Sequence, residues 1–194
     1  MLLVAENNAH PIHGIRCKMQ LIRDLFGLSG PEQEHSETTS DSIQEITKKL
    51  VRLPPEKACH IAAFAYLLGR VAHADLEITS EETMAMEQTV VAHGGLSPEE
   101  ATIVVQIAQV QNLLFGGTEN YLVSREFKKM TQLPERISLL KCLFAVSASD
   151  DAISLAEDNE IGKISRELGI SHKEFIRTRL AFREHLTILR GSPG

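Results

Sequence analysis

The sequence predicts an all-α protein in which two related three-helix units follow a set of N-terminal helices. From Ile43 onward, apolar residues recur every three or four positions, as they do on one face of an α-helix. The same helix-start motif occurs four times, and no segment alternates between apolar and polar residues as a half-buried strand would. The 194-residue chain is 43% hydrophobic but only 5% aromatic, so its core is expected to consist mainly of alanine and aliphatic side chains.

Residues 1–42 are expected to form an arm, a short helix and a polar linker outside the main domain. Residues 19–26 are amphipathic, whereas residues 29–42 are rich in Gly, Pro, Glu and Ser. The short helix contains only one arginine and one aspartate as charges, so we expect it to pack on the domain rather than on a membrane surface. Met19 is a candidate start of the protein, because the residues before it have no evident structural purpose.

The main helical domain is expected over residues 43–190. Pro54-Pro55 ends its first helix, and the next helix is apolar nearly all round, which is typical of a central, buried helix. Together, the apolar spacing and the turn residues predict helices at about 41–53, 56–72, 79–93, 97–115, 118–131, 134–149, 154–168 and 171–189.

Four of these helices begin with the sequence [Ser/Thr]-x-x-Glu, the capping box. In this motif the hydroxyl accepts a hydrogen bond from a backbone N–H of the first turn, and the glutamate accepts one from the backbone N–H of the cap residue. The four motifs are Thr79–Glu82, Ser97–Glu100, Ser154–Glu157 and Ser171–Glu174.

The capping motifs reveal an internal repeat. Residues 72–82 align with residues 147–157 at a constant shift of 75 positions, which places Asp75 over Asp150. Gly-Leu-Ser at 95–97 then aligns with Gly-Ile-Ser at 169–171 after a one-residue gap. Each repeat therefore consists of an apolar helix, an acidic turn, a second helix, a glycine-containing turn and a third helix. The repeats cover about 57–115 and 134–189, and we expect the two copies to pack together.

These motifs resemble those of the tellurite-resistance TerB family, whose pattern is Ala-x-Ala-Asp-Gly-x-Ile-[Ser/Thr]-x-x-Glu followed by Leu-Gly-[Leu/Ile]-Ser. That family also includes the N-terminal domain of the co-chaperone DjlA. The resemblance covers residues 56–189, about two thirds of the chain. It implies an all-α fold with approximate internal two-fold symmetry, a role in stress response or protein interaction, and acidic residues proposed to bind metal. It implies no enzymatic activity.

The chain departs from this pattern where the family has a glycine after the aspartate. Leu76 stands there in the first copy and Asp151 in the second. Aspartate tolerates the left-handed backbone conformation better than leucine does. The departure therefore affects the turn geometry, and with it any metal site that depends on the turn.

The acidic turns offer candidate ligands for Ca²⁺ or Mg²⁺, which prefer oxygen donors. The candidates are Asp75, Glu82, Asp150 and Glu157. The alternative interpretation, which the motifs favour, is that the glutamates cap helices and the aspartates complete turns. An EF-hand is excluded, because the twelfth positions counted from the two aspartates are Met86 and Ile161 instead of glutamate.

An uneven charge distribution predicts a docking surface. No lysine or arginine occurs between Arg70 and Arg125, whereas that stretch contains eight acidic residues. The functional interpretation is a surface for a protein partner with a basic or mixed surface, and the alternative is a solvated face that favours solubility. The residues assigned to this surface are Glu77, Glu81, Glu87, Glu99 and Glu100.

Composition and motifs also narrow the function class. A net charge of −6 argues against nucleic-acid binding, and the longest apolar stretch, residues 61–69, is too short for membrane insertion. Three scattered cysteines without a CxxC motif favour a reducing, cytoplasmic location. No nucleophile elbow, P-loop or HExxH motif occurs. The sequence therefore favours a non-enzymatic interaction module, and the alternative is a small divalent-cation-binding protein that uses the two acidic turns.

Overall fold

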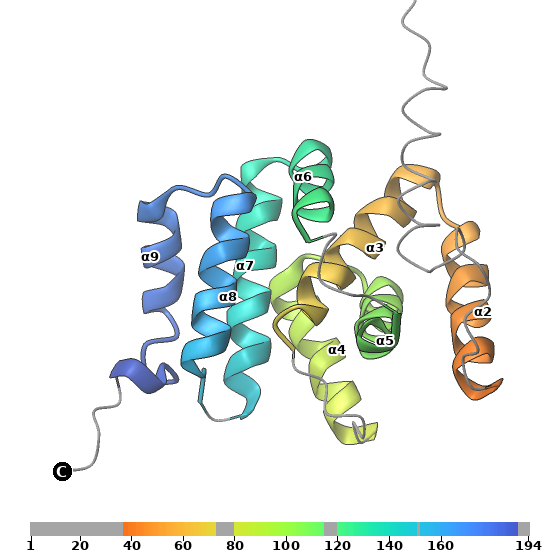
Figure 1. Ribbon diagram of the computed structural model, residues 1–194, viewed down its shortest axis with the longest axis horizontal. Coiled ribbons are helices and arrows are strands. Elements are labelled where there is room, and N and C mark those ends of the chain that lie inside the picture. The colour runs from red at the N-terminus through yellow and green to blue at the C-terminus, as the bar shows by residue number, and fades with distance from the viewer. Residues whose placement is uncertain (1–36, 73–79, 115–119, 151, 190–194) are drawn as a thin grey trace, which may run out of the picture.

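The all-α prediction is confirmed by a computed structural model, which describes residues 37–72, 80–114, 120–150 and 152–189 (Figure 1). These residues contain eight α-helices and no strand. The helices are α2 (Glu37–Val51), α3 (Pro55–Gly69), α4 (Ser80–Gly94), α5 (Pro98–Leu114), α6 (Asn120–Met130), α7 (Leu133–Ser147), α8 (Leu155–Glu167) and α9 (His172–Leu180), with short 3₁₀ turns at Ala148–Asp150 and Thr187–Leu189.

The first half of the described chain comprises α2 to α6, and the second half comprises α7 to α9. Helix α3 is the buried centre of the first half, as its composition predicts. Every residue from Ile61 to Gly69 is buried, and α3 packs against α2, α5, α6 and α7. The helix has no polar stripe, so each of its sides contacts another helix. Phe64 and Phe127 meet edge to face in this core, with ring centroids 6.3 Å apart.

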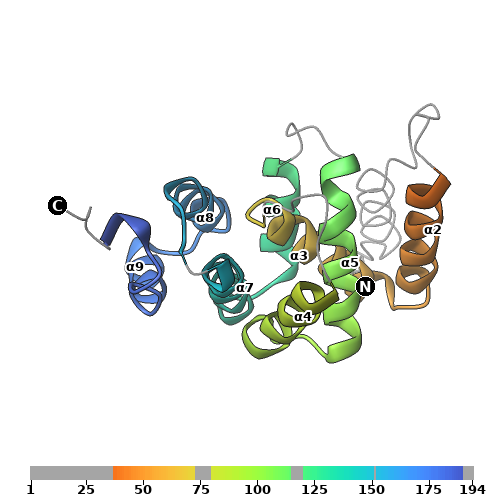
Figure 2. The same cartoon turned by 90° about the horizontal axis from the view of Figure 1, so that it is seen from below.

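Helix α7 is the buried centre of the second half and joins the two halves. It packs against α4 on one side and against α8 and α9 on the other. Figure 2 shows α7 lying between the α4–α5 pair and the α8–α9 pair. The ring of Phe144 stacks on Phe182 and lies 6.0 Å from that of Phe175, so aromatic contacts strengthen the second half.

A buried charge cluster also ties the two halves together. Arg70, the cap residue at the end of α3, has a side chain that is only 4% exposed. Its guanidinium donates to Glu160 on α8 at 2.6 and 2.9 Å, to Glu167 at 2.8 Å and to the hydroxyl of Ser124 on α6 at 3.1 Å. Ser124 donates in turn to Glu167 at 2.5 Å. Arg70 thus fixes the end of α3 against α6 and α8.

Two glycines allow the turns after α4 and α8. Gly95 and Gly169 have φ angles of 72° and 67°, in the left-handed region that other residues rarely adopt. They occupy the same place in the aligned motifs of the two halves. Each lets the chain leave one helix and begin the next within a few residues.

The last predicted helix is wrong beyond residue 180. Helix α9 ends at Leu180, and the chain then turns back toward the loop before α8. There Ile153 donates its N–H to the carbonyl of His185 at 2.7 Å and accepts from the N–H of Thr187 at 3.1 Å. This isolated bridge buries both Ile153 and Leu186 completely or nearly so. The residue that aligns with Ile153 in the first repeat, Ile78, lies outside the described residues.

Replacing Arg70 tests whether its charge cluster holds the halves together. Arg70→Ala leaves Glu160 and Glu167 without their cation, so we expect the free energy of unfolding to fall by about 3 kcal/mol. Arg70→Lys keeps the charge but cannot reach both carboxylates and Ser124, and should lose an intermediate amount. Denaturant unfolding measures both. The control is Arg125→Ala at an exposed position, expected within about 0.5 kcal/mol of wild type. Equal losses for Arg70→Ala and Arg125→Ala would refute the role of Arg70.

Candidate functional site

Two of the four predicted capping boxes are complete in the described residues, and a third is half-formed. At α8, the carboxylate of Glu157 accepts from the N–H of Ser154 at 2.8 Å, and the hydroxyl of Ser154 accepts from the N–H of Glu157 at 3.2 Å. Ser97 and Glu100 form the same reciprocal pair at α5, at 2.9 and 3.4 Å. At α9, Ser171 accepts from the N–H of Glu174 at 3.2 Å. Thr79, the predicted cap of α4, lies outside the described residues.

The predicted acidic surface is divided by the structure. Glu81 and Glu99 are exposed and Glu87 is partly exposed, whereas Glu77 lies outside the described residues. Helices α4 and α5 run antiparallel, because Thr83 near the start of α4 accepts from Gln109 toward the end of α5 at 3.0 Å. Glu81 and Glu99 therefore lie at opposite ends of this hairpin, about 20 Å apart along α4.

Glu100 does not belong to this surface, which corrects the expectation from the charge pattern. The residue is only 7% exposed, because its carboxylate both caps α5 and pairs with Lys57 on α3. Burial opposes ionisation, but the hydrogen bond and charge of Lys57 and the N–H of Ser97 hold the pKa of Glu100 below its ordinary value. Glu100 joins α3 to α5 and is not available to a partner.

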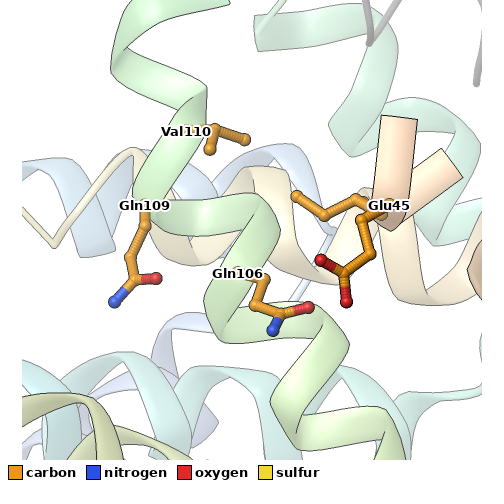
Figure 3. Close-up of a pocket in the computed structure, with 5 residues that line it drawn as sticks. Glu45, Gln106, Gln109 and Val110 are labelled. Carbon is orange, nitrogen blue, oxygen red and sulfur yellow. The ribbon is translucent and has the colours of Figure 1, made fainter. Parts of the chain in front are cut away.

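A small pocket between α2 and α5 is the space shown in Figure 3. It has a volume of about 210 Å³, which is below the usual range for small-molecule sites. Glu45 and Gln106 approach each other across it, while Gln109 is turned away from Glu45 (Figure 3). Lys49 donates to Gln106 at 3.1 Å and pairs with Glu45, so the polar groups are already engaged with one another. The pocket brings together no nucleophile and general base.

A comparison with protein-family models identifies the family of the chain. The family model of the tellurite resistance protein TerB matches residues 60–180, which is more than half of the chain. The chain belongs to the TerB family. The match begins inside α3 and ends with the last residue of α9. It therefore includes most of α3, all of α7, and Arg70 with the residues that it binds, Ser124, Glu160 and Glu167.

No curated protein and no solved structure matches the chain. The resemblance of the sequence motifs to the TerB family is confirmed by the family match over residues 60–180. Within residues 37–72, 80–114, 120–150 and 152–189, no helix is both long and apolar enough to span a bilayer.

Of the four candidate metal ligands that the TerB-like motifs suggest, the described residues include three. Asp75 lies outside the described residues, and Asp150 ends the 3₁₀ turn after α7. Glu82 lies at the exposed start of α4, and one oxygen of Glu157 is bonded to Ser154. The part of the chain that the structure describes contains no group of three or more His, Cys, Asp or Glu side chains that could hold a metal ion. Metal binding by the acidic turns therefore stays a prediction from the sequence.

One titratable residue of this TerB-family chain was not singled out by sequence analysis. His60 on α3 packs against Phe127 with ring centroids 5.2 Å apart. Burial lowers the pKa of His60 below 6.5, and the nearby charges of Glu135 and Glu100 only partly oppose this, while Lys57 adds to it. No local motif predicts this site, because Glu100, Phe127 and Glu135 reach His60 from three other helices, α5, α6 and α7.

Glu157 separates a capping role from a metal-binding role. Glutamine retains an oxygen that can accept from Ser154, so Glu157→Gln should leave the melting temperature nearly unchanged. Glu157→Ala removes the acceptor and should cost about 1 kcal/mol of stability. Thermal unfolding with and without millimolar Ca²⁺ or Mg²⁺ measures both effects, and Glu82→Gln provides the same test at α4. An ion-dependent rise in the wild-type melting temperature that either Gln variant abolishes would instead make the acidic turns metal sites.

The lowered pKa of His60 predicts a pH dependence. Well above pH 6.5 His60 is neutral in both the folded and the unfolded state. As the pH falls below 6.5, the unfolded chain takes up the proton first, so stability is lost until the pH passes the folded pKa. We expect the free energy of unfolding to decrease between about pH 7 and pH 5 less steeply in His60→Gln than in wild type. The exposed-site variant His172→Gln should keep the wild-type slope. Identical slopes for His60→Gln and wild type would exclude this contribution.

Proposed function

We propose that this TerB-family chain is a non-enzymatic interaction module, acting in stress response, that docks a protein partner on the exposed carboxylates of α4 and α5. The observation that carries the proposal is the state of Glu81, Glu87 and Glu99. Among the described residues, no lysine or arginine forms an ion pair with any of them. Their charge is therefore available to a basic or mixed surface.

Eight other acidic residues of the described chain have partners within the protein, which makes this contrast informative. Their partners are cations or helix caps rather than solvent alone. The acids in such contacts are Glu45, Glu100, Glu126, Glu135, Glu157, Asp158, Glu160 and Glu167. A solvated face needed only for solubility would not require the unpaired charges to concentrate on one hairpin.

The absence of catalysis is part of the proposal and is supported by the thiols. Cys142 is fully buried in α7, and burial raises the pKa of its thiol to about 12. A thiol with this pKa is not a nucleophile at neutral pH. Cys59 is also fully buried, in α3. Neither cysteine has the exposed, electropositive surroundings that a catalytic thiolate needs.

The architecture is proposed to derive from a duplicated three-helix unit. The order α3–α4–α5 is matched by α7–α8–α9, and the capping boxes of Glu100 and Glu157 support this relationship. The positive φ angles of Gly95 and Gly169 support it as well. In this proposal the first copy provides the acidic docking hairpin, while the second copy supplies the carboxylates that hold Arg70.

Charge reversal on α4 tests the docking proposal. The protein is used as bait in native cell extract, and the partner recovered is then purified and its binding measured directly. The double variant Glu81→Lys/Glu87→Lys should bind the partner at least about tenfold more weakly, mainly through a slower association rate. The affinity of the wild type should also fall as salt rises, because exposed charges are screened within about 10 Å at 0.1 M salt.

The matched control is Glu45→Lys/Glu174→Lys, which changes the net charge equally on α2 and α9. It should bind the partner as the wild type does if the α4–α5 carboxylates are the docking surface. Equal weakening by both double variants would mean that net charge alone matters. Binding that is insensitive to salt and to both variants would locate the interface elsewhere.

A further inference from the structure

A second surface, with the opposite charge, lies between α8 and α9. This groove has a volume of about 550 Å³. Phe175 and Ile176 of α9, both partly buried, provide its apolar side chains, and Gly162 on α8 contributes no side chain that would fill it. Lys163 and Arg166 line the same groove from α8. The combination of apolar and cationic groups suits an amphipathic helix that carries acidic residues.

The groove is positive because the acids of α8 are engaged elsewhere. Glu160 and Glu167 accept hydrogen bonds from Arg70, and Asp158 accepts two from Arg179 at 2.8 and 2.6 Å. Arg166 is exposed, and no carboxylate of the described residues pairs with it. Lys163 is 53% exposed and forms a long ion pair of 3.8 Å with Glu160, whose other oxygen is bound by Arg70 at 2.6 Å, so its charge is only partly neutralised. Counting charges along α8 would not show this, since its acids outnumber its bases.

Helix α4 presents a surface with the matching chemistry. Its solvent-facing stripe contains one carboxylate, Glu81, followed by side chains that are mostly apolar. Met84 is 56% exposed and Val91 is 37% exposed, so both side chains are open to contact by a partner. The complete stripe, in which positions recur at helical spacing, is Glu81, Met84, Ala85, Gln88, Val91 and Ala92.

We propose that α4 of one molecule binds in the α8–α9 groove of a second copy of this chain. Met84 and Val91 would pack on Phe175 and Ile176, and Glu81 would face Lys163 and Arg166. The contact cannot form within one molecule, because α7 lies between α4 and the groove (Figures 1 and 2). The two surfaces differ, so the association is head to tail, and each bound pair keeps one free α4 and one free groove.

The small contact area of one helix in one groove makes this association weak and reversible. Analytical ultracentrifugation of the full chain should show an average mass that rises with protein concentration at low salt, about 0.05 M, and falls at about 0.5 M. Arg166→Glu disables the groove and Met84→Lys disables the α4 stripe. Each variant alone should associate at least about tenfold more weakly than the wild type.

Mixing the two variants gives the decisive result. Arg166→Glu retains an intact α4, and Met84→Lys retains an intact groove, so the mixture should form one-to-one dimers that cannot grow further. The matched controls are Lys173→Glu, an exposed lysine of α9 outside the groove, and Val51→Lys, an exposed valine of α2. Both should associate as the wild type does. Melting temperatures verify that all four variants are folded.

Three outcomes would overturn the proposal. The wild type could remain a monomer at all concentrations, the controls could weaken association as much as the site variants, or the mixture could fail to form dimers. A wild type that stays monomeric but binds a synthetic acidic amphipathic peptide in the groove would also overturn it, since the occupant would then be another protein. Arg166→Glu leaves Glu81, Glu87 and Glu99 intact, so these outcomes are separable from the docking function proposed for α4 and α5.

Discussion

The guanidinium of Arg70 is the interaction on which the arrangement of the two halves depends. Arginine presents its donors in a rigid, planar fork, and here that fork reaches two carboxylates and one hydroxyl at the same time. Burial alone would disfavour the charged form of Glu167, but Arg70 and Ser124 hold the pKa of Glu167 below its ordinary value. A buried charge of this kind is costly without its partners, so α3, α6 and α8 are constrained to meet at one point.

Local features of the sequence predicted the helices well. Capping boxes, prolines and glycines act within a few residues, and for this reason the starts of α5, α8 and α9 lie within one residue of their predicted positions. The central position of α3 was also predictable, because a helix without a polar side must be covered all round. Kinship with the TerB family was visible in the acidic turns and in the glycine-containing turns that follow them.

Features that depend on distant partners were not predictable. Arg70 lies 90 and 97 positions from the two glutamates that it binds, and no periodicity in the sequence connects them. Glu99 and Glu100 are neighbours in the same acidic stretch of sequence, yet Glu100 is buried against Lys57 and Glu99 is exposed. Helix α9 was predicted too long, because helical propensity continues past Leu180 while the backbone of Ile153 provides competing hydrogen-bond partners. The sequence therefore predicted which charges could form the candidate site. It did not predict that they lie at opposite ends of the α4–α5 hairpin.

The bridge between Ile153 and Leu186 has a consequence for the order in which the protein acquires its structure during synthesis. The turn before α8 receives its backbone partners from His185 and Thr187, more than thirty positions later in the chain. A nascent chain that has emerged only as far as α9 leaves the N–H and carbonyl of Ile153 bonded to water. This turn should therefore be among the last regions to resist hydrogen exchange, even though the helix after it has a complete cap of its own.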